Sequence, residues 1–256
     1  MRFDIENFRL DGKVAVVTGA GAGIGRAIAE LFASAGASVM VSDLDAGAAV
    51  AVSEAIGAAG GNAAATGCNV TEEADLVMLV NRAADEFGGV DVLVNNAGGG
   101  GPKPFDMPMS DFEWAYRLNV FAAFRLTQLC AAQMARRGGG AVLNISSMAG
   151  ENANSRMASY ASSKAAVNHL TRNIAFDLGP MGIRVNAIAP GAIKTHALST
   201  VLTPEIERHM LAKTPLARLG EPGDIAHAAL FLCAPASAWV SGQVLTVSGG
   251  GIQELD

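Results

Sequence analysis

The stretch Thr18-Gly-Ala-Gly-Ala-Gly-Ile-Gly25 decides the fold of this chain. It lies between a β-branched run, Lys13–Thr18, and a helical pattern, Gly23–Ala35, in which apolar residues return every three or four positions. Glycines let the backbone turn sharply and let a pyrophosphate group approach the N–H groups at a helix N-terminus. The spacing is G-x-x-x-G-x-G rather than G-x-G-x-x-G, and a glycine cluster by itself can be a tight turn. Its place between a first strand and a first helix predicts a nucleotide-binding loop.

Strand-like and helix-like stretches alternate outward from this loop. Strands are expected over Lys13–Thr18, Ser38–Ser42, Asn62–Thr66, Val90–Asn95, Ala141–Ser146, Arg184–Ala189 and Gln243–Val247. Helices are expected over Gly23–Ala35, Ala46–Ala59, Glu72–Phe87, Asp111–Arg137, Ser159–Leu178 and Asp224–Cys233. Parallel strands need crossovers, usually helices, and strands that read as apolar runs are buried on both faces. The pattern predicts an α/β fold, a Rossmann-type doubly wound parallel sheet of about seven strands with helices on both faces.

The domain organisation follows from the absence of a linker or a break in composition. Residues 1–256 are expected to form a single domain with a lid over about residues 191–220. The irregular stretches Gly98–Pro108, Met148–Met157 and Pro190–Gly220 all follow strands. They should gather at the carboxyl edge of the sheet, where open α/β sheets bind ligands.

Composition excludes several other classes. The 256 residues include 30 glycines without a G-X-Y period, and half of the residues are hydrophobic, so neither collagen nor disorder fits. The net charge of −6 argues against nucleic-acid binding. The N-terminus lacks an apolar signal-peptide core and no run of ~18 apolar residues occurs, which predicts a cytoplasmic protein outside the membrane. Cys68, Cys130 and Cys233 are widely spaced and are expected to be buried, with neither a disulfide nor a metal.

Asp43 ends the second expected strand, 18 residues after Gly25. A carboxylate there can accept hydrogen bonds from an adenosine ribose 2′-hydroxyl and would repel a 2′-phosphate. Its neighbours Ser42, Leu44 and Asp45 are not basic. The alternative role, capping the next helix, fits Asp45 better. The sequence therefore predicts NAD rather than NADP as the cofactor.

Tyr160-Ala-Ser-Ser-Lys164 lies in an expected helix, where the i, i+4 spacing puts Tyr160 and Lys164 on one face. A tyrosine pKa of ~10 is too high for a base near neutrality. A neighbouring ammonium and a cationic nicotinamide ring both favour the phenolate, and lowering the pKa by ~3 requires about 4 kcal/mol. The phenol could then exchange a proton with a substrate alcohol or carbonyl. Taken alone, a Tyr–Lys pair on a helix is usually a solvated side-chain contact.

Ser147 adds a third polar group to this pair. It follows the expected strand Ala141–Ser146 and stands 13 residues before Tyr160. A serine hydroxyl at the carboxyl end of a strand can hydrogen-bond the same substrate oxygen, and alternation along the strand sends Ser146 to the other side. The sequence has no G-x-S-x-G elbow, which argues against acyl transfer.

Together these motifs resemble the short-chain dehydrogenase/reductase family. They are the glycine loop, Asn95-Asn-Ala-Gly98, Asn119, Ser147, Tyr160-x-x-x-Lys164 and Pro190-Gly191, in order over about residues 10–250. The resemblance implies hydride transfer to a nicotinamide and a homotetramer. It implies that Ser147 orients the substrate and that Tyr160 is the acid/base. It further implies that Lys164 holds the ribose hydroxyls and lowers the tyrosine pKa, and that Asn119 holds a proton-relaying water.

The family's cofactor contacts carry over to matching positions. They are Gly19, Gly23, Ile24, Gly25, Asp43, Leu44, Asn69, Val70, Asn96, Ala97, Gly98, Tyr160, Lys164, Pro190, Gly191, Ile193 and Thr195. One position departs from the family pattern, which often has Asp-Val after the third strand, with the Asp on the adenine amine. Here the pair is Asn69-Val70, and the Asn69 carbonyl oxygen is expected to accept that hydrogen bond with weaker discrimination. The alternative for Asn69 is a turn-forming asparagine.

The substrate is indicated by a closer likeness within the family. Segments 8–13, 98–108, 189–193 and 248–255 resemble members that oxidise the 7α-hydroxyl of bile acids to a 7-oxo group with NAD. Candidate substrate contacts are Gly100, Ser147, Asn152 and Tyr160, with Asn154 nearby. The expected lid carries apolar residues that could cover a flat apolar ligand: Ile193, Leu198, Val201, Leu202, Met210 and Leu211.

Two other functions stay open. The first is a family member acting on another substrate, such as a 3-oxoacyl carrier-protein reductase, which Asp43 disfavours because those reductases generally prefer NADP. The second is a non-catalytic NAD-sensing protein, for which an intact Ser147, Tyr160 and Lys164 would have no use.

Overall fold

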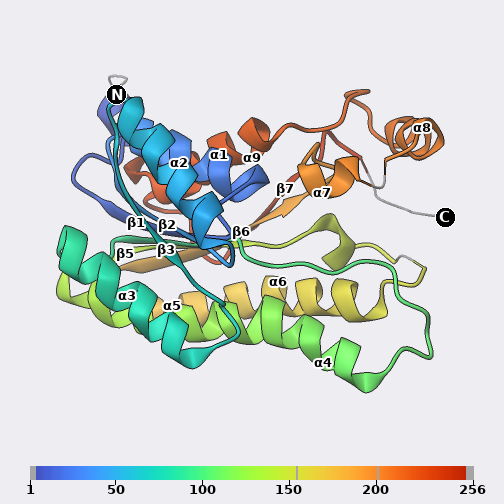
Figure 1. The fold of residues 1–256 in the computed structure, drawn as a ribbon, viewed down its shortest axis with the longest axis horizontal. Helices are drawn as coiled ribbons and strands as arrows, with labels where there is room; N and C mark the ends of the chain where they lie inside the picture. The colour runs from blue at the N-terminus through green and yellow to red at the C-terminus, as the bar shows by residue number, and fades with distance from the viewer. Residues whose placement is uncertain (1–3, 154, 201, 252–256) are drawn as a thin grey trace.

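The fold is built on parallel strands joined by helical crossovers, as Figure 1 shows for the computed structural model. Residues 4–153, 155–200 and 202–251 are described, and within them seven parallel strands form one sheet in the order β3-β2-β1-β4-β5-β6-β7. The strands are β1 (Val14–Thr18), β2 (Ser38–Asp43), β3 (Asn62–Gly67), β4 (Val92–Asn95), β5 (Gly140–Ile145), β6 (Ile183–Pro190) and β7 (Val244–Val247). The expected α/β doubly wound sheet is confirmed.

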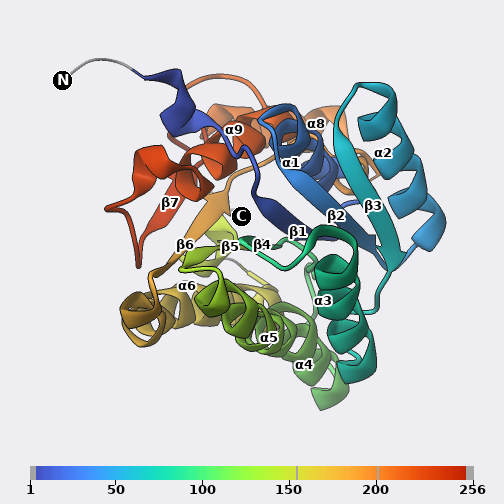
Figure 2. The same cartoon turned by 90° about the vertical axis from the view of Figure 1, so that its left-hand side faces the viewer.

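Helices cover both faces of the sheet (Figures 1 and 2). One face carries α1 (Gly23–Ser34), α2 (Ala46–Ala58) and α9 (Pro222–Cys233), and the other carries α3 (Glu73–Phe87), α4 (Met109–Tyr116), α5 (Ala122–Arg136) and α6 (Ala158–Leu178). Two short helices, α7 (His196–Ser199) and α8 (Pro204–Ala212), lie within the expected lid. Short 3-10 turns are η1 (Ile5–Phe8), η3 (Met148–Gly150), η4 (Gly179–Met181) and η5 (Pro235–Ser237).

Strands β1 to β6 each contribute side chains to two hydrophobic cores, one on each face of the sheet. In β1, Ala15 and Val17 pack into the core under α1 and α9, whereas Val16 packs into the core under α3 and α5. This follows from the period of two along a strand, and it explains why the strands read as unbroken apolar runs. Phe32 of α1 is completely buried in the first core, which contributes roughly 1.5–3 kcal/mol.

The helix expected over Asp111–Arg137 is wrong as a single regular element. The structure divides it into α4, a π-helical segment η2 (Arg117–Phe121) and α5. A π-turn inserts one extra residue per turn, which an apolar period cannot reveal, and such turns are frequent at functional sites. Here the π-turn contains Asn119, whose side chain is buried.

The irregular stretches are tied to one another beyond the strand ends. The Lys103 backbone N–H donates to the Arg156 carbonyl at 2.7 Å, joining the segment after β4 to the segment after β5. The segment 191–220 is closed at its neck, where Lys194 donates to the Gly220 carbonyl at 2.7 Å and Gly220 donates to the Ala192 carbonyl at 2.9 Å. In the described part of the chain, no helix is long and apolar enough to cross a bilayer.

Candidate active site

The glycine loop joins β1 to α1, and its conformation requires residues without a side chain at several positions. Gly19 and Gly23 have φ of 60° and 56°, in the left-handed region that favours glycine. A Cβ on Gly25 would overlap the carbonyl oxygen of Gly19. Among the described residues, no side chain caps the N-terminus of α1, where Ala22 is the N-cap residue. Its first N–H groups therefore fit an anionic group such as a pyrophosphate.

The loop is held by the end of β4. The hydroxyl of Thr18 accepts hydrogen bonds from the backbone N–H groups of Asn96 at 3.1 Å and Ala97 at 3.0 Å. The Asn96 amide in turn donates to the carbonyls of Thr18 and Gly19, both at 2.9 Å. Sequence reasoning assigned Asn96 and Ala97 to the cofactor but missed the bracing by Thr18.

A cleft of about 430 Å³ opens beside the loop. It is lined by predicted cofactor residues, namely Gly19, Asp43, Leu44, Asn69, Val70, Asn96, Ala97 and Gly98. Sequence reasoning missed four further lining residues: Cys68, Thr71, Trp114 and Leu118. Ile24, also predicted to bind the cofactor, is partly buried, and its side chain packs against the core beneath α1. Residues of this lining include no lysine or arginine, so the cleft offers no cation to a ribose 2′-phosphate.

Asp43 is held at the rim of this cleft. One carboxylate oxygen accepts from the Gly21 N–H at 2.8 Å and the other from the Asp45 N–H at 3.0 Å. Asp45 caps α2, accepting from the N–H groups of Gly47 and Ala48, as expected from the sequence. Two backbone donors thus orient the Asp43 carboxylate without neutralising its charge.

Asn69 follows β3 and forms a turn. Its side-chain oxygen accepts from both the N–H and the hydroxyl of Thr71, at 3.1 and 2.8 Å, and its own N–H donates to the Asp75 carboxylate at 2.8 Å. The turn-forming alternative therefore describes its geometry, although Asn69 also lines the cleft.

Ser147, Tyr160 and Lys164 converge beyond the end of β5. Ser147 lies close enough to the Tyr160 hydroxyl to lower the tyrosine pKa, although burial has the larger effect and raises it. The Lys164 ammonium nitrogen lies 5.8 Å from the centre of the Tyr160 ring and donates to the Ile145 carbonyl at 2.9 Å. Burial lowers the pKa of Lys164 to about 8.

The sequence predicts a lowered pKa for Tyr160, whereas in the structure this pKa is raised. In the protein alone, burial disfavours the charge on Tyr160 more than Ser147 favours it. The Lys164 ammonium is hydrogen-bonded to a backbone carbonyl and lies 5.8 Å from the centre of the Tyr160 ring. The phenolate therefore depends on a further positive charge near the hydroxyl.

Asn119 joins this group from the π-turn. Its amide oxygen accepts from the Gly99 N–H at 3.0 Å, and its nitrogen donates to the Gly99 carbonyl and to the Ser163 hydroxyl. A Cβ on Gly98 would lie 2.7 Å from the Asn119 oxygen and 3.1 Å from the Lys164 nitrogen. The bare Gly98 backbone thus lets Asn119 and Lys164 approach each other.

Two serines that sequence reasoning did not assign position α6. The Ser146 hydroxyl donates to the Lys164 carbonyl at 3.1 Å, which ties β5 to the helix. Ser163 donates to the Tyr160 carbonyl at 2.7 Å while accepting from Asn119. Neither shows in a motif, because each contact depends on how β5 and η2 pack on α6.

The remaining predicted contacts lie around the same edge. Gly100 packs against Tyr160, since its Cβ would lie 2.5 Å from the tyrosine Cδ2. Thr195 caps α7 and lies above the loop, its methyl 3.3 Å from where a Gly23 Cβ would be. Pro190 ends β6, and the Gly191 N–H that follows it donates to the Val247 carbonyl at 3.0 Å. Asn152 lies in the segment after η3, and Asn154 lies outside the described residues.

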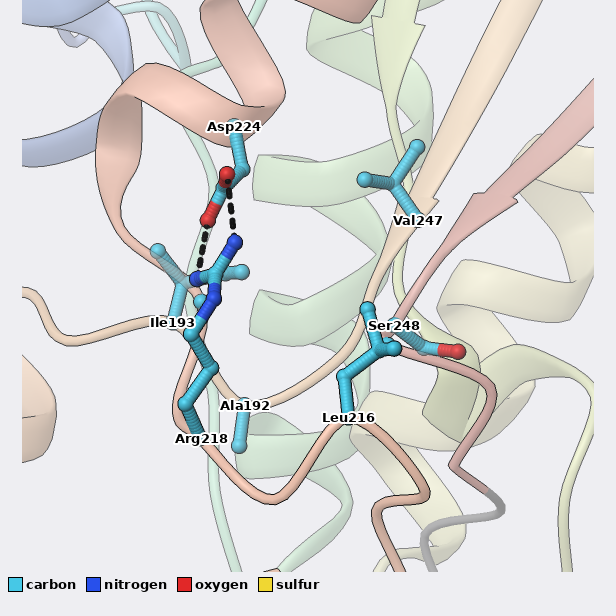
Figure 3. A pocket seen from close by; sticks show the side chains of 9 residues that line it. Ala192, Ile193, Leu216, Arg218, Asp224, Val247 and Ser248 are labelled. Carbon is cyan, nitrogen blue, oxygen red and sulfur yellow. Dashed lines mark hydrogen bonds and ion pairs between the residues drawn. The ribbon is translucent and has the colours of Figure 1, made fainter.

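A second pocket of about 200 Å³ lies at the neck of segment 191–220 (Figure 3). Ile193 lines it, and across it Arg218 pairs with both oxygens of Asp224, at 2.6 and 2.9 Å. The two backbone hydrogen bonds of Gly220, with Lys194 and Ala192, hold the neck of the segment together beside this ion pair. The ion pair therefore anchors the end of segment 191–220 to the start of α9.

The three cysteines are spread over the fold, and Cys68 is the one that lines the cleft. Cys68, Cys130 and Cys233 are buried free thiols, as predicted, and burial raises the pKa of each, to about 11 for Cys68 and about 12 for Cys233. Across the described residues there is no group of three or more His, Cys, Asp or Glu side chains that could hold a metal ion.

Comparison with known proteins places this geometry in a family. Residues 19–251 match the family model described as enoyl-(acyl carrier protein) reductase. The chain belongs to the short-chain dehydrogenase/reductase family.

Among individual relatives, the chain is 63% identical to the 7alpha-hydroxysteroid dehydrogenase of Escherichia coli (strain K12), over 99% of this chain and 100% of that protein. It is 39% identical to a 3-oxoacyl-[acyl-carrier-protein] reductase of Vibrio cholerae, over 94% of this chain and 98% of the other. A 7α-hydroxysteroid dehydrogenase solved with NADH and 7-oxo glycochenodeoxycholic acid superposes with a TM-score of 0.98 at 62% identity, over 100% of both chains.

Proposed function

We propose that this protein is an NAD-dependent 7α-hydroxysteroid dehydrogenase, which oxidises the 7α-hydroxyl of bile acids to a 7-oxo group. One observation carries the proposal: the Ser147, Tyr160 and Lys164 cluster lies in a chain that is 63% identical, from end to end, to a dehydrogenase of that name. The solved relative, whose complex holds NADH and a 7-oxo bile acid, supports both the cofactor and the substrate class.

The residues of the cleft suit NAD. The open N-terminus of α1 would hold the pyrophosphate, and the oriented carboxylate of Asp43 would bind the adenosine ribose. When bound, NAD supplies an acceptor for the hydride that leaves C7 of the steroid. The absence of Lys and Arg from the lining favours NAD over NADP.

In the proposed reaction the alcohol loses two hydrogens, one as a hydride from C7 and one as a proton from the hydroxyl. As the hydride leaves C7, the hydroxyl proton passes to Tyr160, with Ser147 holding the same oxygen. Lys164 and Asn119 would then pass a proton toward solvent, a role that their approach at Gly98 supports. The buried Tyr160 needs a nearby positive charge to ionise, and an oxidised nicotinamide carries one.

We also propose the assembly, the domain organisation and the location. A single domain with its lid at 191–220 would form a cytoplasmic homotetramer. Exposed apolar side chains on α4, η2, α5, α6 and α9 and just after η5 support self-association: Met109, Trp114, Phe121, Phe124, Phe176, Phe231 and Trp239. Lid residues Ile193, Leu198, Leu202, Met210 and Leu211 would cover the steroid, and Val201 lies outside the described residues.

The test follows NADH absorbance with cholate as substrate. Deoxycholate, which lacks the 7-hydroxyl, is the matched control and should give no NADH. If cholate gives none either, while an acetoacetyl thioester is reduced with NADPH, the chain is a 3-oxoacyl reductase. Tight NAD binding without turnover of any alcohol would indicate a sensor instead.

A further inference from the structure

The buried hydroxyl of Ser163 is a part of the site to which the proposed reaction gives no role. Ser163 lies on α6 between Tyr160 and Lys164, and its side chain is completely buried. Alanine forms helices better than serine, and a buried hydroxyl is costly unless it is hydrogen-bonded. The two partners of this hydroxyl, the Tyr160 carbonyl and the Asn119 amide, therefore indicate its role.

The direction of the hydrogen bonds at Ser163 is fixed by chemistry. A carbonyl oxygen can only accept, so the Ser163 hydroxyl donates its single proton to the Tyr160 carbonyl, 2.7 Å away. The hydroxyl oxygen is then left to accept, and the Asn119 atom that it meets at 3.0 Å must be the amide nitrogen. Ser163 thereby sets which end of the Asn119 amide faces α6.

The rest of the Asn119 amide is held by the backbone of Gly99. The amide nitrogen donates its second hydrogen to the Gly99 carbonyl at 2.9 Å, and the amide oxygen accepts from the Gly99 N–H at 3.0 Å. Both hydrogens of the nitrogen are therefore used, whereas the oxygen keeps one lone pair. Asn119 can meet a further group only as an acceptor.

That acceptor oxygen lies near the ammonium group of Lys164. The Cβ position that Gly98 leaves empty is 2.7 Å from the Asn119 oxygen and 3.1 Å from the Lys164 nitrogen. The two atoms are therefore no more than about 6 Å apart, a distance that one bridging water can span. Because an ammonium group only donates, the opposite orientation of the amide would place a donor against a donor.

Resting on the proposed function, in which Lys164 and Asn119 pass a proton toward solvent, we infer that Ser163 is a positioning residue for this relay. Ser163 acts through Asn119: it holds the amide nitrogen against α6 and so keeps the amide oxygen near Lys164. Without the hydroxyl, one N–H of the buried Asn119 side chain loses its acceptor, which disfavours this orientation of the amide.

The test compares four full-length proteins: the wild type, Ser163→Ala, Asn119→Ala and the double variant. Oxidation of cholate, followed by NADH absorbance, gives kcat, and calorimetry gives the NAD dissociation constant. Ser163→Ala should lower kcat roughly tenfold and leave the NAD dissociation constant unchanged. In the Asn119→Ala background the same change should lower kcat by less than about twofold, because the residue through which Ser163 acts is already absent.

The solvent isotope effect provides a second measurement. If proton transfer through the relay becomes slower in Ser163→Ala, the ratio of kcat in H2O to kcat in D2O should rise above the wild-type value. Ser162→Ala is the matched control, since it removes a hydroxyl that donates to the Ala158 carbonyl of the same helix. It should leave kcat, the isotope effect and NAD affinity at their wild-type values.

Three results would overturn the inference while the proposed function stands. They are a wild-type kcat in Ser163→Ala, an equal loss of kcat in both backgrounds, and a parallel loss of kcat and NAD affinity. The last two would show that the hydroxyl supports the fold independently of Asn119. A wild-type protein that forms no NADH from cholate would instead refute the proposed function itself.

Discussion

Lys164 donates from its ammonium nitrogen to the carbonyl oxygen of Ile145, 2.9 Å away and 19 residues earlier in the chain. The contact joins α6 to the last residue of β5, the strand that leads into Ser147. Ser146 reinforces it by donating to the Lys164 carbonyl. The two reciprocal bonds set the height of α6 along β5, and with it the position of Tyr160 relative to Ser147.

Burial of Lys164 makes the stability of the fold depend on pH. Its pKa is about 8 in the folded protein against 10.5 for an ordinary lysine, so the unfolded chain binds the proton more tightly. The contribution to stability is therefore complete above pH 10.5 and is lost as the pH falls through 8. Relative to Lys164→Met, the wild-type free energy of unfolding should rise by about 2–3 kcal/mol between pH 7 and pH 10.

Urea denaturation of both proteins at the two pH values checks this, because the difference between them cancels the other titrating groups. Lys194→Met, at an exposed position, serves as the control and should show no pH-dependent difference from wild type. A parallel pH dependence for wild type and Lys164→Met would contradict the buried ammonium.

Tyr160→Phe should lower kcat by roughly 10² to 10⁴, the range for loss of a general acid–base, while the NAD dissociation constant stays nearly unchanged. Because burial raises the pKa of Tyr160, alcohol oxidation by the wild type should also accelerate as the pH rises from 7 to 9. Tyr116→Phe, which keeps the ring stacked on Phe112, is the matched control in steady-state kinetics. Retained activity in Tyr160→Phe would show that another group takes the proton.

Gly100→Ala should impair catalysis through Tyr160. The new Cβ would lie 2.5 Å from the tyrosine Cδ2, and φ of 145° disfavours any side chain. Displacement of the ring should reduce kcat roughly tenfold or more with little change in NAD affinity. Gly101→Ala is the matched control, since its Cβ would meet no described atom within 4 Å. Equal kcat values for the two variants would exclude this contact as a constraint on the base.

Asp43→Ala should raise the KM for NAD about tenfold and relax the preference against NADP, because a charge-assisted hydrogen bond to the ribose is lost. Asp45→Ala removes the α2 cap and should lower stability by about 1 kcal/mol without changing the cofactor ratio. Kinetics with both cofactors separate the two roles. An unchanged NAD-to-NADP ratio in Asp43→Ala would remove Asp43 from the ribose contact.

The sequence by itself determined the parallel sheet and most of the cleft. Apolar runs such as Val14–Thr18 are buried on both faces of the sheet. The helical spacing of α1, which follows this strand, indicates a helical crossover to a parallel neighbour. The local sequence pattern therefore agrees with the parallel sheet. The glycine loop and Asp43 follow from their positions at strand ends, since parallel strands end at one edge.

Only the tertiary structure decided how the polar groups are oriented. The π-turn that brings Asn119 to Gly98, the oxygen of Asn69 held by Thr71, and the Lys164 contact with Ile145 each depend on partners whose distance no periodicity encodes. The reason is that apolar burial depends on a repeating pattern, which a sequence displays. A hydrogen bond depends on the approach of two particular atoms, and the packed fold sets that distance.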